Sequence, residues 1–274
     1  AGTMGNGIAQ TFAASGYRVN LIDVNADALE RGLATIAKSL GRFVKKEKMT
    51  QDQVDEILAR ITGSTEIASA KDSKLVVEAV VERLDVKSSI FAELDTLCAP
   101  DAILATNTSS ISITAIAAAT KRPDKVIGMH FMNPVPVMKL VEVIPSVRTS
   151  EAVTASMTVF ATDVLDKVVV AAKDRAGFVV NMLLVPYLNA AMRMYADGHA
   201  TAADIDNGMK LGAAHPMGPL ELSDMIGLDT MMLVAETLFA EYGDDFYLPP
   251  PLLRRMVAAG HLGRKTGRGF YDYS

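Results

Sequence analysis

Short apolar runs alternate with longer amphipathic stretches over the first two thirds of the chain. A short run bounded by polar residues is typical of a strand in a parallel sheet, whereas apolar residues at helical spacing indicate a helix. Strands of this kind, separated by helices, predict a doubly wound α/β domain. The predicted strands lie at 17–22, 75–80, 102–107, 126–132, 139–144 and 167–172.

Two regions depart from this alternation. Residues 26–60 predict two helices, with Thr50 as the N-cap of the second. From Gly177 onward no strand is expected before the final GFYDY; helices are expected at 178–198, 202–211, 229–243 and 250–260, with the Gly-Pro pair at 218–219 as a break. The chain therefore divides into a first domain, 1–174, with a helical excursion at about 26–60, and an all-helical second domain, 175–274.

The second domain is unusually apolar for a small helical bundle. We expect part of its apolar surface to form a subunit interface, which suggests a homodimer. The alternative is that the same residues fill a single intramolecular core. The residues concerned are Leu183, Leu184, Val185, Met192 and Met231.

Three glycines, Gly2, Gly5 and Gly7, open an apolar helix near the start of the chain. Asp23 directly follows the strand at 17–22. A glycine loop, helix, strand and terminal acid form the second half of a dinucleotide-binding unit. The acid can bond the adenosine ribose hydroxyls, and its charge favours NAD over NADP, although NADP remains possible.

The complete dinucleotide fingerprint needs one more glycine just before Ala1 and a strand before that. We therefore expect the natural protein to be longer at its N-terminus by one strand. Such a strand would lie at the centre of the sheet.

A possible proton-transfer pair lies between residues 128 and 144. His130 lies in one apolar run and Glu142 in the next, and the turn between them contains Pro134 and Pro136. Two strands joined by this turn can bring the imidazole and the carboxylate side by side. A neutral imidazole held by a carboxylate suits proton abstraction near pH 7. The stretch alone leaves open a buried structural histidine with a glutamate at a strand edge.

Bulk composition narrows the function further. The net charge of −5 and the pI near 5.4 argue against nucleic acid or an anionic membrane as the main partner. The single cysteine, Cys98, excludes a disulfide framework and suits a reducing cytosol, so we expect a cytoplasmic protein. The four scattered histidines suggest no metal cluster. No apolar run approaches the roughly 20 residues of a membrane span.

A basic cluster follows the first helix of the excursion and comprises Arg42, Lys45, Lys46 and Lys48. One interpretation is a solvated helix end. The other is an electrostatic clamp for a polyphosphate tail, such as that of coenzyme A. The cluster alone leaves both interpretations open.

The chain resembles the short-chain L-3-hydroxyacyl-CoA dehydrogenase family over its whole length. The matching stretches include AGTMGNGIAQ, VVEAVVERLDVK, ATNTSSISIT, IGMHFMNPVPVMKLVEVI, GFVVNMLLVPYLN, HPMGPLELSDMIGLD and LGRKTGRGFYDY. The resemblance implies a Rossmann-type domain followed by a helical domain. It also implies reversible oxidation of a short-chain L-3-hydroxyacyl-CoA, such as (S)-3-hydroxybutyryl-CoA, to the 3-ketoacyl-CoA with NAD.

The resemblance also assigns roles by position. His130 would be the catalytic base, Glu142 would orient its ring, and Ser109 would bond the reacting oxygen. Asn181 would bind the substrate carbonyl region, although taken alone it reads as a polar residue at a helix start. The implied cofactor contacts are Gly2, Thr3, Met4, Gly5, Asp23, Glu82, Lys87, Asn107, Asn133 and Lys265. The implied substrate and coenzyme A contacts are Ser39, Lys46, Asn107 and Ser109.

Some residues depart from the family pattern. Met132 replaces a usual phenylalanine, Met182 an arginine that often follows GFVVN, and Asp174-Arg175-Ala176 stands where a proline is more usual. Two alternative functions are a β-hydroxyacid dehydrogenase of another type, which would use a lysine for proton transfer, and a non-enzymatic binding protein. The combination of His130, Glu142, Ser109 and Asn181 favours the first assignment over both.

Overall fold

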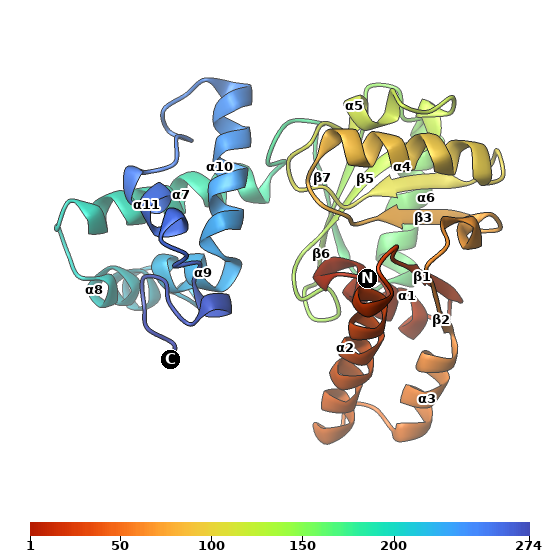
Figure 1. Ribbon diagram of the computed structural model, residues 1–274, viewed down its shortest axis with the longest axis horizontal. Coiled ribbons are helices and arrows are strands. Elements are labelled where there is room, and N and C mark those ends of the chain that lie inside the picture. Colours follow the sequence, from red (N-terminus) through yellow and green to blue (C-terminus); the bar gives the residue numbers. More distant parts are fainter. The chain divides into compact units, whose positions relative to one another are not determined.

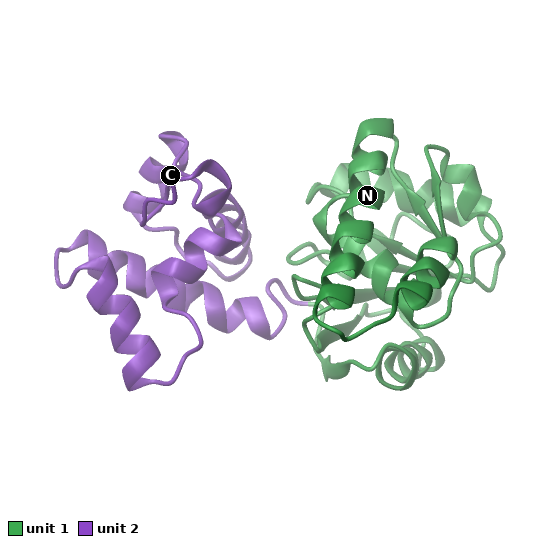
Figure 2. Cartoon of the chain, turned by 90° about the horizontal axis from the view of Figure 1, so that it is seen from below, with its two compact units in different colours: residues 1–174 green, residues 175–274 purple.

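The computed structural model describes residues 1–274. The chain divides into two compact units, residues 1–174 and residues 175–274 (Figure 2). No helix of either unit combines the length and the apolar character that crossing a bilayer requires.

Unit 1 contains seven strands in two sheets (Figure 1). The strands are β1 (Val19–Ile22), β2 (Ile61–Ser64), β3 (Leu75–Glu78), β4 (Ile103–Thr106), β5 (Val126–Phe131), β6 (Leu140–Pro145) and β7 (Val168–Ala171). β1 and β2 form a parallel pair, and the other sheet has the order β3-β4-β5-β6-β7. Its neighbours are parallel except for β5 and β6, which are antiparallel. The predicted α/β class is confirmed, whereas the strand expected before Ala1 stays a prediction.

The helices of unit 1 agree closely with the hydrophobic pattern. They are α1 (Thr3–Ala14), α2 (Ala26–Lys45), α3 (Gln51–Ala59), α4 (Leu84–Leu97), α5 (Ile113–Ala117) and α6 (Glu151–Val159), with 3₁₀ turns at Ile67–Ala70 and Pro123–Lys125. The predicted N-cap, Thr50, forms a reciprocal capping box with Gln53 at the start of α3. Helix α6 is followed directly by a π-helical turn, Phe160–Val164.

Helix α1 connects two apolar cores. Ile8 packs in the core of the larger sheet, which includes Ile127 and Met129, while Ala9 and Ala13 pack in the core formed with α2 and α3. A Cβ atom on Gly7 would lie only 3.0 Å from Cβ of Val135, in the turn between β5 and β6. A glycine at this position therefore allows α1 to approach that turn closely.

The parallel register brings three chain segments to one edge of the larger sheet. Glu78 at the end of β3 pairs with Thr106 at the end of β4, and Thr106 pairs with Gly128 of β5. Residues that follow these strand ends therefore gather at the carboxyl edge, which is where open α/β sheets bind ligands.

Unit 2 is helical, as predicted. Its helices are α7 (Val180–Ala196), α8 (Ala202–Asn207), α9 (Pro219–Ile226), α10 (Leu228–Tyr242) and α11 (Pro251–Ala258), with a π turn at Gly208–Gly212 and a 3₁₀ turn at Arg264–Thr266. The Gly-Pro pair that the sequence indicated as a break starts α9, because Pro219 occupies its first turn. Asp206 caps this helix by accepting hydrogen bonds from the backbone N–H groups of Leu220 and Glu221.

The core of unit 2 corrects part of the interface prediction. Val185, Met192 and Met231 are buried in the intramolecular core, and Leu184 packs against it. Of the five predicted interface residues, Leu183 is the one that is largely exposed, at 71%. The homodimer itself stays a prediction.

The terminal GFYDY segment forms isolated bridges rather than a strand. Buried Asp224 fixes it by accepting hydrogen bonds from the backbone N–H groups of Phe270 and Tyr271 and from the Tyr273 hydroxyl. The end of the chain is therefore tied to α9.

Candidate active site

His130 and Glu142 form a buried pair on the neighbouring strands β5 and β6 of the larger sheet. They occupy directly opposed positions of antiparallel β5 and β6, so their side chains lie on the same face. Nδ1 of His130 lies 2.6 Å from Oε2 of Glu142. His130 is 5% exposed and Glu142 is fully buried. The predicted side-by-side placement of the two residues is confirmed.

The second ring nitrogen of His130 contacts Ser109. Nε2 lies 3.1 Å from the Ser109 hydroxyl oxygen. A carboxylate only accepts hydrogen bonds, so Glu142 selects the neutral tautomer with the proton on Nδ1, and Nε2 then accepts from the Ser109 hydroxyl. A ring with one nitrogen bonded to an acid and an unprotonated nitrogen beside a hydroxyl is arranged to receive a proton.

Glu82 holds the turn that carries Ser109. Its carboxylate accepts hydrogen bonds from the backbone N–H of Ser109 at 2.5 Å and from the Thr108 hydroxyl at 3.0 Å. These hydrogen bonds fix the backbone of Ser109 and thereby help to set the distance between its hydroxyl oxygen and Nε2 of His130. The position of Glu82 next to Ser109 is compatible with its predicted cofactor role, which stays a prediction.

Lys87 lies beneath this turn between two carboxylates. Its ammonium is 2.7 Å from Oε1 of Glu78 and 3.2 Å from Oε2 of Glu82, and the residue is only 1% exposed. The direct cofactor contact expected of Lys87 stays a prediction, but its burial favours a supporting role. Sequence reasoning assigned no role to Glu78; the one signal was an acid in the apolar run LVVEAV.

Asn107 fastens β4 to the end of β5. Its side-chain oxygen accepts a hydrogen bond from the backbone N–H of Phe131 at 2.9 Å, and its own N–H donates to the Glu78 carbonyl. Its predicted contact with both cofactor and substrate would involve its side-chain nitrogen. Asn133 lies exposed in the turn after β5.

The start of α1 fits the pyrophosphate of a dinucleotide. No side chain caps this helix and its first turn has no acidic residue, so the first backbone N–H groups and the positive end of the helix dipole are available to an anion. A Cβ atom on Gly2 would have no neighbour within 4 Å, which leaves room for a phosphate. Thr3 and Met4 form the first turn. Asp23 lies beside this loop, with Oδ2 2.7 Å from the Ala1 nitrogen.

Two predicted site residues belong to unit 2. Asn181 lies half-buried in the first turn of α7. Lys265 forms an ion pair with Asp229, at 2.5 Å. The substrate role of Asn181 and the cofactor role of Lys265 stay predictions.

Two of the residues predicted to bind substrate and coenzyme A, Ser39 and Lys46, lie on one face of α2 or just beyond its end. Ser39 is half-buried, Lys46 is exposed, and Phe43 lies between them at helical spacing. None of the four side chains of the basic cluster forms an ion pair with the protein. Their charges are therefore available to an anion, although cations also stabilise a helix C-terminus.

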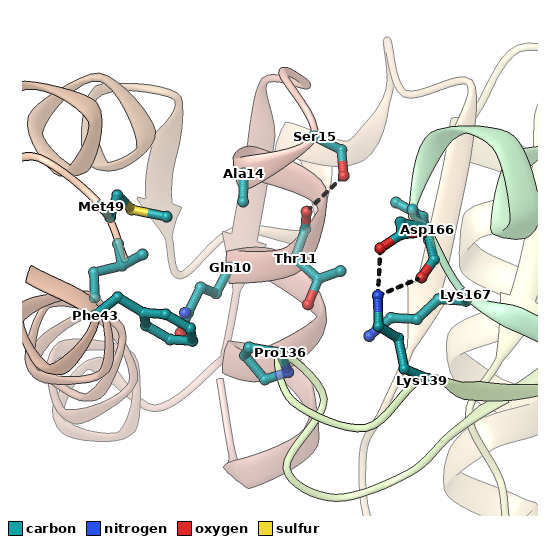
Figure 3. A pocket seen from close by; sticks show the side chains of 12 residues that line it. Gln10, Thr11, Ala14, Ser15, Phe43, Met49, Pro136, Lys139, Asp166 and Lys167 are labelled. Carbon is teal, nitrogen blue, oxygen red and sulfur yellow. Dashed lines mark hydrogen bonds and ion pairs between the residues drawn. The ribbon is translucent and has the colours of Figure 1, made fainter. Parts of the chain in front are cut away.

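A cavity of about 220 Å³ adjoins this face of α2 (Figure 3). It lies between α1, α2 and the residues around Pro136 and Lys139, and the Phe43 ring forms part of its wall. Gln10, which is 3% exposed, also lines it. The cavity does not include His130, so it is separate from the proposed chemistry. No group of three or more His, Cys, Asp or Glu side chains could hold a metal ion.

A glycine loop with an adjacent acid, on an α/β domain whose carboxyl edge holds a buried His–Glu pair, defines an NAD-dependent dehydrogenase. The family models agree. Residues 1–175 match the NAD-binding domain of 3-hydroxyacyl-CoA dehydrogenase, and residues 177–273 match its C-terminal domain. The chain belongs to the 3-hydroxyacyl-CoA dehydrogenase family, which makes it an oxidoreductase.

Similar proteins match the whole chain. A 3-hydroxybutyryl-CoA dehydrogenase of Mycobacterium tuberculosis is 51% identical over 274 residues, covering 100% of this chain and 96% of that protein. One from Clostridioides difficile is 50% identical, covering 100% of this chain and 97% of that protein. The crystal structure of (S)-3-hydroxybutyryl-CoA dehydrogenase PaaH1 from Ralstonia eutropha superposes with a TM-score of 0.94 at 49% identity, covering 100% of this chain and 96% of that one.

Gly2→Ala tests the assignment of the glycine loop. The variant is expected to fold normally, because the added methyl group meets no atom. It should raise the Kd for NADH about tenfold, the equivalent of ~1.4 kcal/mol, because the methyl group takes the space of the phosphate. Fluorescence titration with NADH measures this effect.

Gly41→Ala is the matched control, since Gly41 also has open space around its Cα but lies within α2. It should leave the NADH affinity unchanged and stabilise the fold by ~0.5–1 kcal/mol. Equal NADH affinity for Gly2→Ala and the wild type would contradict the loop assignment.

Proposed function

We propose that the protein catalyses the reversible NAD-dependent oxidation of (S)-3-hydroxybutyryl-CoA to acetoacetyl-CoA. The observation that carries the proposal is the hydrogen bonding of the two His130 ring nitrogens, one to Glu142 and the other to Ser109. Relatives about 50% identical over the full chain are 3-hydroxybutyryl-CoA dehydrogenases, which supports the choice of substrate.

His130 transfers the proton, and Ser109 positions the oxygen that loses or gains it. Nε2 of His130 accepts the proton of the substrate 3-hydroxyl, and the bond to that hydrogen breaks as C3 becomes a carbonyl. The glycine loop would hold NAD, which would supply the acceptor for the hydride that leaves C3. In the reverse direction the imidazolium returns the proton to the 3-keto oxygen. Ser109 holds that oxygen at the distance from Nε2 that proton transfer requires.

Glu142 makes this cycle possible inside the protein. An imidazolium with 5% exposure has little water around it, so its charge needs a protein partner. The carboxylate 2.6 Å from Nδ1 provides that charge and fixes the ring orientation. The arrangement is the His–acid half of the Ser-His-Asp triad, with a substrate hydroxyl in place of the serine.

Residues outside this pair would hold the two large ligands. Asp23 beside the glycine loop would bond the adenosine ribose hydroxyls, with Asn107, Asn133, Glu82 and Lys265 as further contacts of NAD. Coenzyme A would lie along the Ser39–Lys46 face of α2, where the unpaired cations can bind its phosphates. Asn181 would donate its amide N–H to the substrate carbonyl and stabilise developing negative charge.

His130→Gln tests the catalytic role. Glutamine can hydrogen bond but cannot take a proton near neutral pH, so turnover of acetoacetyl-CoA with NADH should fall about 10²–10⁴-fold. The melting temperature and the Kd for NADH should stay close to those of the wild type. The readout is NADH absorbance.

His199→Gln is the control, because His199 is exposed at the end of unit 2 helix α7 and its replacement should leave turnover unchanged. Near-normal turnover of His130→Gln would refute the role. A wild-type protein that binds NADH but leaves acetoacetyl-CoA unreduced would refute the proposed function.

The proposed assembly is a homodimer formed through unit 2. Helix α7 carries an exposed stripe at helical spacing, Leu183, Ala190 and Met194, of which Leu183 is 71% and Met194 43% exposed. Sedimentation of the wild type should show a dimer, and Leu183→Glu should shift it toward the monomer. Leu211→Glu, at a residue 85% exposed outside this stripe, should remain dimeric. A monomeric wild type would contradict the proposal.

A further inference from the structure

We propose that the charges of Glu78, Lys87 and Glu82, the first two of them buried, set the pH range in which His130 can act as a base. They would act through the turn that carries Ser109. The inference rests on the proposed function of His130, and it assigns a positioning role to Glu78, a residue that touches neither His130 nor Ser109.

Glu78, Lys87 and Glu82 form a rigid group. Glu78 accepts hydrogen bonds from the Val80 N–H at 2.6 Å, the Lys87 ammonium at 2.7 Å and the Thr106 hydroxyl at 2.7 Å. Both of its carboxylate oxygens are therefore bonded. Because Lys87 is 1% and Glu78 4% exposed, water has little access to either charge. The ammonium is consequently held in one place between Glu78 and Glu82.

A series of contacts connects this group to His130. Lys87 contacts Glu82 at 3.2 Å, Glu82 accepts the Ser109 N–H at 2.5 Å, and the Ser109 hydroxyl lies 3.1 Å from Nε2. One residue, Ser109, thus separates the carboxylate of Glu82 from the imidazole. The contacts form a continuous chain from β3 to the reacting nitrogen.

The groups around the His130 imidazole determine its charge environment. Glu142 of β6 is the acid in direct contact with His130, and Ser109 is the contact from the turn after β4. Next to them, β4 and the residue after it contribute the uncharged Thr106 and Asn107, and α5 contributes Ile113 beside Gly128. The charge at the start of α5 is the Asp174 carboxylate, which accepts hydrogen bonds from the backbone N–H groups of Ile113 and Thr114 and is the same in all the variants below. Among the charges beyond this shell, Glu78, Lys87 and Glu82 together carry −1.

The sign of the effect follows from Coulomb's law. A nearby negative charge stabilises the imidazolium and therefore extends the protonated state to higher pH. Glu78→Gln changes the charge of the group from −1 to 0, so His130 should remain a neutral base at lower pH. Lys87→Gln changes it to −2 and should have the opposite effect. The double variant restores −1.

The experiment measures the acid limb of kcat/KM for oxidation of (S)-3-hydroxybutyryl-CoA against pH, since this limb reports the base in the free enzyme. Glu78→Gln should shift the limb downward, and Lys87→Gln upward, each by roughly 0.5–1 pH unit, the scale expected when one charge is removed from a partly screened site. The double variant should lie close to the wild type. A merely structural role would move both single variants in the same direction or leave the limb unchanged.

Asp101→Asn is the matched control, because it removes the same charge from an exposed ion pair with Lys74. Its acid limb should coincide with that of the wild type. If the two carboxylates left by Lys87→Gln prevent folding, the test rests on Glu78→Gln and the double variant, whose limbs must differ by the stated shift.

A second readout separates this proposal from the proposed function. The NMR titration of the His130 ring, identified among the four histidines by its absence in His130→Gln, needs no turnover. Ring titrations that shift in opposite directions in the two single variants support the inference even if the wild type lacks the activity. Unshifted ring titrations, or shifts of one sign, overturn it.

Discussion

The structure of the site depends on one buried contact, that between the imidazole of His130 and the carboxylate of Glu142. Neither group reaches water appreciably, so the neutral ring donates a hydrogen bond to the carboxylate, and the carboxylate compensates the charge that the ring takes up when it accepts a proton. A buried carboxylate left without a donor commonly costs about 1–3 kcal/mol or more, a loss that glutamine at position 130 avoids because its amide can still donate. The same contact that stabilises the sheet locally also leaves Nε2 as the nitrogen that can accept a proton.

The topology of the sheet makes this contact possible. β5 and β6 are the only antiparallel neighbours in their sheet, and this pairing places residues twelve positions apart directly opposite each other. β3, β4 and β5 are parallel, which brings the turns after β3 and β4 to the same edge. Ser109, in the turn after β4, contacts His130, and Glu82, after β3, accepts the backbone N–H of Ser109. Rigid strands therefore hold the base, and its hydroxyl neighbour lies on a turn fixed by a carboxylate.

Local sequence patterns predicted much of this arrangement. The apolar runs at β3 to β7 were long enough to identify, and the single histidine in β5 and the single acid in β6 indicated the pair.

β2 was missed because Ile61–Ser64 is short, half-exposed and without an apolar alternation. Helix α9 was missed because its N-cap acceptor, Asp206, lies fourteen residues before Leu220 in the chain. Val185, Met192 and Met231 were among the candidates for an interface because composition alone does not distinguish a packed core from a contact surface. The importance of Glu78 depends on Lys87 and Thr106, which only the fold brings to it.

The central claim is that Glu142 fixes the neutral His130 ring with its proton on Nδ1, so that Nε2 is free to accept one. Nitrogen-15 NMR of the ring at a pH where it is neutral measures this directly, because protonated and unprotonated ring nitrogens have well-separated shifts. The account predicts a protonated Nδ1 and an unprotonated Nε2. A ring that carries its proton on Nε2 would contradict it.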